Sequence, residues 1–296
     1  MSRPSPLLAL PLLSVACGSG YIDDVLQKVC KQRIPRRAPA GFGGLAAATL
    51  DAPGAVCNDG SPGRMYLRRA TDPAHVSDWV IYLEGGGYCD NWESCSERWC
   101  GIEFDATKMT TQFAPNRQPG RGILSPRSDN AFSGYNHAML YYCSSDSWLG
   151  RSGERSLQGP DDYFLQFEGH TIIMAALARL DQGALSDDET TLLPRLTEAS
   201  QIIWAGSSAG AVGTMHHLDL VASRYPEADV VGLIDAQLNP APGTIDPGPE
   251  LRVNALLQDR WDQDQSGLYS AYTDPDCSGW RCIEYWDLQL RRLQTP

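Results

Sequence analysis

The pentapeptide Gly206-Ser207-Ser208-Ala209-Gly210 holds the residues of this 296-residue sequence whose types and spacing best fit chemistry. An apolar run at 201–205 precedes it, and a helix-like stretch up to residue 224 follows it. A strand, a Gly-x-Ser-x-Gly turn and a helix together make a nucleophile elbow, which presents its central serine for covalent ester chemistry. We therefore predict Ser208 as a nucleophile; the alternative is a structural turn of small residues.

Three glycines at 85–87 follow a second apolar run, at 79–83. When a serine attacks an ester, the negative oxygen that forms needs preorganised hydrogen-bond donors. A loop without side chains lets its backbone approach the substrate carbonyl, and the residue after the nucleophile supplies another N–H. We expect oxyanion-hole donors at Gly86, Gly87 and Ala209.

The sequence shows no base for Ser208. In α/β-hydrolases the acid and the histidine follow the serine along the chain, and the histidines that follow it here are His216 and His217. They lie on the helix that starts at the elbow, roughly 12 Å or more along its axis, so we expect packed or solvated helix residues. His75, His137 and His170 precede the serine, and no pattern places them as a base. The triad acid and histidine are unidentified: either the base is unusual or lost, or the sequence is truncated at its C-terminus, which we favour.

Composition excludes several classes of function. A hydrophobic content of 42% supports one large core, and no linker-like shift in composition divides the chain, so we expect one domain over 18–296. The net charge of −12 argues against a nucleic-acid partner, because phosphate binding needs clustered Lys and Arg. No segment reaches the length of apolar residues that spans a bilayer, so we expect no transmembrane helix.

The N-terminus resembles a short secretory signal. Residues 1–17 combine one cation, an apolar stretch at 7–16 and a small-residue end. We expect a signal peptide over 1–17 and a secreted protein. A lipoprotein signal ending at Cys17 and a wrongly assigned N-terminus are the alternatives.

Nine cysteines fit an oxidising compartment, where disulfides persist. Short loops favour local bridges, so we expect Cys277–Cys282 and a bridge from Cys89 to Cys95 or Cys100. Zinc is the competing interpretation, but the sequence has no Cys-x-x-Cys pair and only His75 lies near the cluster. We expect neither a metal nor another cofactor.

The pattern along the chain predicts an α/β fold. We expect strands at 79–83, 137–143, 201–205 and 230–235, and helices from Asp161 to Gly183, at 209–224 and at 281–293. This alternation favours a mostly parallel sheet flanked by helices. We expect residues 30–63 to form a loop with an edge strand. Residues 90–134 are predicted to be an irregular insertion, long enough to suggest a functional loop rather than a plain connection.

Five motifs together resemble the pectin acetylesterase and Notum family of secreted carboxylesterases. They are Cys57-Asn-Asp-Gly-Ser-Pro62, Leu83-Glu-Gly-Gly-Gly-Tyr-Cys89, Gly122-Ile-Leu-Ser125, Tyr142-Cys-Ser-Ser-Asp-Ser-Trp148 and Ala205-Gly-Ser-Ser-Ala-Gly210. The resemblance implies an α/β-hydrolase fold without a cofactor, Ser208 as nucleophile, and donors at Gly86, Gly87 and Ala209. It also implies that the segment from Tyr142 to Asp146 lines the site's neighbourhood, and that Cys143 bridges to Cys57. Family members carry the acid and the histidine after a segment like 290–296, so neither maps onto a residue here.

The two branches of this family differ in substrate. Pectin acetylesterases remove acetyl groups from polysaccharide, whereas Notum removes a fatty acyl group from a secreted protein. We expect an acylated polysaccharide as substrate and a deacetylase activity; an acylated protein substrate is the alternative. A non-catalytic secreted module with this fold is the alternative of another class, and the oligomeric state is left open.

Overall fold

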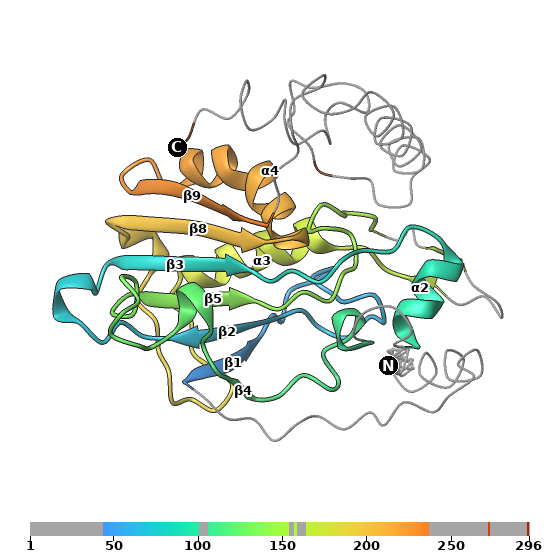
Figure 1. Ribbon diagram of the computed structural model, residues 1–296, viewed down its shortest axis with the longest axis horizontal. Coiled ribbons are helices and arrows are strands. Elements are labelled where there is room, and N and C mark those ends of the chain that lie inside the picture. Colours follow the sequence, from blue (N-terminus) through green and yellow to red (C-terminus); the bar gives the residue numbers. More distant parts are fainter. Residues whose placement is uncertain are drawn as a thin grey trace, which may run out of the picture.

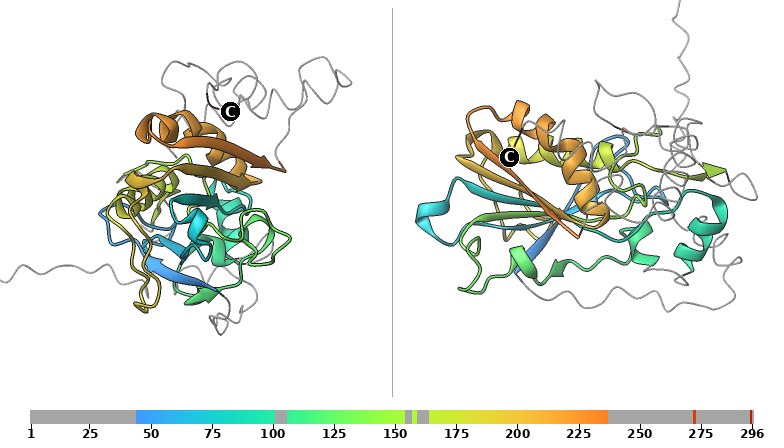
Figure 2. Two further views of the ribbon diagram at one scale, coloured as in Figure 1. Left: turned by 90° about the vertical axis from the view of Figure 1, so that its left-hand side faces the viewer. Right: turned by 45° about the horizontal axis from the view of Figure 1, so that its top comes forward.

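A computed structural model describes residues 44–100, 106–153, 157–158, 164–236, 272 and 295. Their central feature is a seven-stranded sheet with the order β4-β1-β2-β5-β3-β8-β9. Helices α3 (Gly169–Asp181) and α4 (Ala209–Arg224) lie side by side behind it (Figures 1 and 2). The ion pair Asp181–Arg224 and the hydrogen bond His170–His217 join these two helices.

One half of the sheet is parallel. Strands β3 (Asp78–Leu83), β5 (Asn136–Leu140), β8 (Gln201–Ser207) and β9 (Asp229–Asp235) run in the same direction. The inner strands are almost continuously apolar because both of their faces are covered. Their carboxyl ends meet at one edge: Leu83 pairs with Gly206, and Ser207 pairs with Asp235. The two motifs predicted to do chemistry therefore share an edge.

The other half of the sheet is antiparallel, and the sequence analysis resolved little of it. Strands β1 (Leu45–Thr49), β2 (Arg64–Arg68) and β4 (Arg117–Gln118) pair antiparallel, and β2 joins this half to β5. β1 lies inside the sheet, between β4 and β2, so the edge position expected within 30–63 is wrong. Its residues are buried on both faces, which removes the alternation that would mark a strand in the sequence.

Two other expected boundaries need correction, and one of them is the strand predicted at 137–143, which ends at Leu140. The helix predicted from Asp161 begins at Gly169, because Phe164–Leu165 forms strand β7 with β6 (Leu157–Gln158). The predicted end is right: Gly183 follows the last turn with φ of +83°, a conformation that suits glycine.

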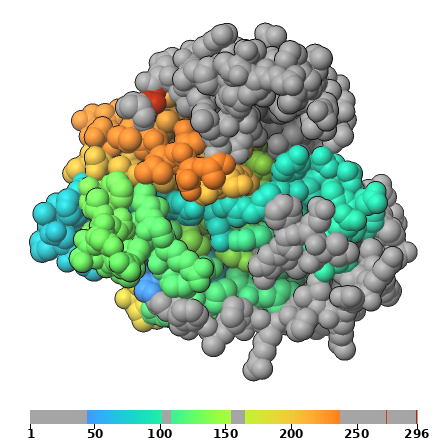
Figure 3. All heavy atoms as spheres, viewed as in Figure 1, coloured from blue at the N-terminus to red at the C-terminus, as the bar shows by residue number. Residues whose placement is uncertain are grey.

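The segment 90–134 is less irregular than predicted. It contains helix α2 (Trp92–Trp99), which Asn91 and Ser94 cap reciprocally. Short 3-10 helices complete the fold: η1 Pro73–His75, η2 Ala106–Met109, η3 Gly122–Leu124 and η5 Leu196–Glu198. In the space-filling view the green segment around η3 lies directly below the orange atoms of β9 and α4 (Figure 3).

Disulfides join parts of the chain next to the shared edge. Cys57 is bonded to Cys143, across 86 residues, and Cys89 is bonded to Cys95. Cys100 is disulfide-bonded as well. The expected signal peptide at 1–17, the pair Cys277–Cys282 and the helix at 281–293 lie outside the described residues. Of the helices that the structure describes, none is long and apolar enough to span a membrane.

Candidate active site

Ser208 occupies the sharp turn between β8 and α4. Its backbone has φ of 55° and ψ of −120°, outside the regions that L-residues prefer. The flanking glycines are needed for close packing: a Cβ on Gly206 would lie 2.3 Å from Gly210 O, and one on Gly210 would lie 2.0 Å from Leu83 O. Both contacts are too short for any real side chain. The Gly-x-Ser-x-Gly spacing thus allows the tight turn that leaves Ser208 exposed.

The backbone of Ser208 is fixed while its side chain is not engaged. The Ser208 N–H donates to Asp235 O at 3.0 Å, and Ser208 O accepts from Val212 N at 3.2 Å. Within the described part of the chain no side-chain cap bond holds the hydroxyl. Ala209 begins the sixteen-residue helix α4, so its N–H belongs to the positive end of the helix dipole. This terminus favours negative charge that develops beside Ser208.

The three-glycine loop packs against this elbow. A Cβ on Gly85 would lie 2.3 Å from Ser207 O and 3.2 Å from Ser208 Cβ. Gly86 and Gly87 have φ of +151° and +68°, values that favour glycine. The fold therefore brings the start of the glycine loop to the turn that carries Ser208, although Gly85 and Ser208 lie more than a hundred residues apart.

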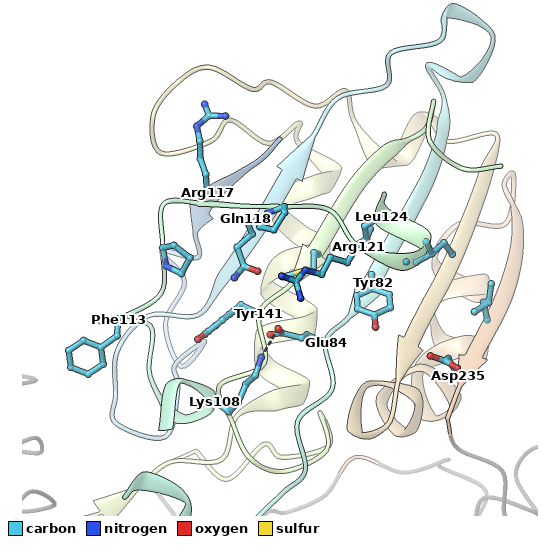
Figure 4. A pocket seen from close by; sticks show the side chains of 16 residues that line it. Tyr82, Glu84, Lys108, Phe113, Arg117, Gln118, Arg121, Leu124, Tyr141 and Asp235 are labelled. Atoms are coloured by element: carbon cyan, nitrogen blue, oxygen red, sulfur yellow. Dashed lines mark ion pairs between the residues drawn. The ribbon is translucent and has the colours of Figure 1, made fainter. Parts of the chain in front are cut away.

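A cavity of about 680 Å³ lies in front of the sheet, beside the same edge (Figure 4). The ion pair between Lys108 Nζ and Glu84 Oε1, at 2.5 Å, lies within it. Asp235 forms part of the wall and also binds Ser208 N–H through its carbonyl, although Ser208 is not a lining residue. The wall is formed by Tyr82, Glu84, Lys108, Phe113, Pro115, Arg117, Gln118, Pro119, Arg121, Gly122, Ile123, Leu124, Met139, Tyr141, Leu233 and Asp235.

The lining combines apolar surface with a few charges. Burial raises the pKa of the Tyr82 hydroxyl, and the nearby carboxylates of Glu84 and Asp235 add to this, whereas a hydrogen bond with Ser207 lowers it. Tyr82 therefore stays neutral at ordinary pH and presents a polar tip on an aromatic ring. Sequence reasoning missed this wall, since its residues come from four separate segments and carry no common motif.

The segment from Tyr142 to Asp146 supports the glycine loop from behind. Asp146 is fully buried and accepts hydrogen bonds from the N–H groups of Trp148, Gly150 and Gly169. Burial raises the pKa of Asp146 to about 6, and these hydrogen bonds with that of Ser144 lower it in part. Its carboxyl group is saturated by donors, so Asp146 is a structural residue. The described groups of His, Cys, Asp and Glu include no cluster suited to a metal ion.

All five histidines lie among the described residues, and the hydrogen bonds found there join none of them to Ser208. His217 Nδ1 donates to Gly213 O at 2.8 Å, so its Nε2 accepts from His170 Nδ1 at 2.9 Å. Tyr272 stacks on both rings. Burial lowers the pKa of His170 to about 4, and burial also holds the pKa of His217 well below its usual value.

The remaining histidines also have other surroundings. His137 bonds to Arg68 and Phe132, His75 bonds to Asp78, and His216 is buried on α4. The structure thus packs the glycine loop against the elbow of Ser208, and it places every histidine in another environment.

Comparison with known proteins supports a family assignment. The sequence model described as pectinacetylesterase matches residues 45–238. Among curated relatives, palmitoleoyl-protein carboxylesterase NOTUM of Homo sapiens is 34% identical over 190 residues, which cover 61% of this chain and 34% of the relative. The Drosophila melanogaster protein of the same description is 32% identical over 243 residues, covering 73% of this chain and 34% of the relative.

A solved structure agrees with these relatives. The Wnt deacylase Notum from Drosophila superposes with a TM-score of 0.65 at 27% identity, covering 86% of this chain and 70% of that chain. The chain spans about a third of the length of the curated relatives it matches.

Proposed function

The chain belongs to the pectinacetylesterase family, with its α/β-hydrolase-like fold, and on this basis we propose that it carries the nucleophile and oxyanion half of a serine carboxylesterase site. One observation carries the proposal: Gly85 lies so close to Ser207 and Ser208 that no side chain fits between the glycine loop and the elbow. The loop that carries two of the proposed N–H donors therefore begins directly against the elbow.

The proposed reaction is acyl transfer to Ser208. Its Oγ attacks the ester carbonyl, a base takes its proton, and the carbonyl oxygen becomes an oxyanion. The N–H groups of Gly86, Gly87 and Ala209 are the proposed donors to that oxygen, and the N-terminus of α4 adds favourable potential. Collapse of the intermediate releases the alcohol and leaves an acyl-serine, which water then hydrolyses. No step needs a cofactor.

The acid and the base of this site are not assigned to any residue of the chain. Each of the five histidines has other surroundings, as described above. We expect slow turnover by the 296 residues alone, because an oxyanion hole without a working triad still accelerates hydrolysis, by about 10³- to 10⁴-fold over water in a serine protease. The same observation favours a second candidate of another class, a non-catalytic module that keeps the hydrolase fold.

The proposed substrate is an acylated polysaccharide that loses O-acetyl groups, outside the cell. Disulfides in the described residues fit an oxidising compartment. A fatty acyl group on a protein is the alternative, and the names of the curated relatives favour it.

The nucleophile is tested by mapping acetylated residues after incubation with p-nitrophenyl acetate. We expect mass spectrometry to find the acetyl group preferentially on Ser208, and Ser208→Ala to lose it. Ser223→Ala is the matched control, because Ser223 is an exposed serine near the other end of the same helix. Acetylation spread evenly over exposed serines would support the non-catalytic module.

The acyl group is tested with p-nitrophenyl esters of increasing chain length. An acetylesterase should react fastest with the two-carbon ester and lose rate steadily beyond four carbons, because a shallow pocket excludes longer chains. A maximum at eight carbons or more would replace the polysaccharide proposal with the protein fatty-acyl alternative.

A further inference from the structure

Tyr142 is completely buried behind the glycine loop. Its ring packs against Trp148, with ring centroids 5.2 Å apart. A Cβ on Gly86 would lie 3.3 Å from Tyr142 Cδ1 and equally close to Lys108. The loop therefore lies directly on this aromatic ring, and a Cβ on Gly86 would be in tight contact with it.

The hydroxyl of Tyr142 makes two hydrogen bonds whose directions are determined by their partners. The Ser147 N–H donates to Tyr142 Oη at 2.7 Å, and Oη is 2.7 Å from Gly87 O. A carbonyl oxygen only accepts, so the hydroxyl proton must point at Gly87. The carbonyl of Gly87 is thereby held toward the buried hydroxyl of Tyr142.

The backbone of the same tyrosine is bonded to the other end of the loop. The Tyr142 N–H donates to Glu84 Oε2 at 3.1 Å, and Glu84 Oε1 pairs with Lys108. Trp148 Nε1 also donates to Glu84 O, at 2.9 Å. One residue thus contacts both Glu84, just before the three glycines, and Gly87, the last of them.

This anchoring matters because three consecutive glycines have the widest backbone freedom available to a chain. Fixing a backbone residue costs about 1–2 kcal/mol in conformational entropy, and glycine lies at the high end. A loop left free would have to be ordered during the reaction, which would weaken its stabilisation of an oxyanion. Bonds at Glu84 and Gly87 order it beforehand, with the N–H groups of Gly86 and Gly87 between the two anchors.

We infer that Tyr142 is a positioning residue that holds the oxyanion loop in its working conformation through the hydrogen bond from its hydroxyl to Gly87 O. This inference rests on the proposed function, because it takes Gly86 and Gly87 as oxyanion donors. The tyrosine touches neither Ser208 nor the expected position of the substrate, so it acts through the loop.

The experiment compares two reactions of one nucleophile in the variant Ser208→Cys. A thiol ionises without a histidine base, so the unassigned acid and base do not limit the assay. In acylation the thiolate attacks p-nitrophenyl acetate through an oxyanion, a thioester forms and p-nitrophenolate leaves. In alkylation the same thiolate displaces iodide from iodoacetamide without an oxyanion. The ratio of the two rates, followed by peptide mapping at position 208, measures oxyanion stabilisation alone.

We expect Tyr142→Phe, added to Ser208→Cys, to lower the ratio of acylation to alkylation about 10- to 100-fold, in the range for a displaced oxyanion donor. Tyr135→Phe is the matched control: Tyr135 is buried as well, and its hydroxyl donates to Gln201 Oε1 at 3.0 Å, at the opposite end of β8 from the elbow. It should leave the ratio unchanged. An unfolded variant would also lose the raised ratio, so urea unfolding must first show that Tyr142→Phe is folded under the assay conditions.

The outcomes separate the two proposals. If the ratio in Ser208→Cys is no higher than that of free N-acetylcysteine, the oxyanion site itself fails, and this inference fails with it. If the ratio is raised but Tyr142→Phe leaves it intact, only the role of Tyr142 is overturned. Should Tyr142→Phe not fold, replacement of Tyr142 by p-aminophenylalanine keeps a donor for Gly87 O. That variant must retain the raised ratio, and loss of it would contradict the inference.

Discussion

Two residue types with catalytic potential lie in opposite environments, one at the start of helix α4 and the other in its third turn. Ser208, just before the helix, is exposed, has a strained backbone and makes no side-chain hydrogen bond within the described chain. His216 and His217, two turns later, are buried, and His217 is bonded to Gly213 and His170. The helix starts at the carboxyl ends of the parallel strands and continues over the face of the sheet. The position of a residue along α4 therefore decides whether its side chain is exposed. A catalytic residue type becomes functional only where the fold exposes it.

The largest effect should follow from disturbing the first turn. In Gly210→Ala the added Cβ would overlap Leu83 O at 2.0 Å, so the helix must move away from β3. We expect a loss of at least about 4 kcal/mol in the free energy of unfolding, or no folded protein. Urea denaturation measures it. Gly44→Ala, whose Cβ would meet Arg68 Cδ at an ordinary 3.7 Å, is the control, with a change within about 0.5 kcal/mol.

The buried histidines should make the protein acid-sensitive. Burial, helped by Arg151, lowers the pKa of His170 from 6.5 to about 4 in the folded protein. Between these pH values the unfolded chain binds a proton that the folded chain does not, so stability is lost as pH falls through this window. The loss from His170 alone amounts to up to about 3 kcal/mol.

His170→Gln keeps a donor for His217 Nε2 but removes this titration, so its stability should fall less between pH 7 and pH 4.5 than that of the parent. Urea unfolding at both pH values gives the difference. Asp146, whose pKa burial raises to about 6, acts in the opposite sense in both proteins, so the comparison isolates the histidine. Equal pH slopes would show that His170 is not protected from protons, against the burial described here.

The smallest effect has the opposite sign and concerns backbone strain at Ser208. Glycine adopts φ of 55° and ψ of −120° without the cost that a side chain imposes. Ser208→Gly should therefore raise the free energy of unfolding by about 1 kcal/mol while removing the nucleophile. Ser208→Ala removes the nucleophile and keeps the Cβ, so it should show no gain. A stable Ser208→Ala equal to Ser208→Gly would mean that the elbow stores no strain.

Local patterns predicted much of the parallel half of the molecule. Helix α4 spans 209–224 as predicted, and β3, β8 and β9 match their apolar runs within two residues. The strands are continuous apolar runs, and β3 and β8 lead into glycines, so neighbours in the sequence suffice to specify them. The antiparallel strands β1, β2 and β4, helix α2 and the start of α3 were missed or misplaced, because short buried strands and hairpins depend on partners far along the chain.

The sequence by itself determined the chemical motifs, since the elbow at Ser208 and the glycine loop at 85–87 each lie within a few consecutive residues. Only the tertiary structure decided that the loop touches the elbow, that Tyr142 holds Gly87, and that the histidines lie elsewhere. These contacts join residues 47 to more than 100 positions apart. No local propensity encodes such pairs; the register of the parallel strands and the packing of α3 on α4 create them.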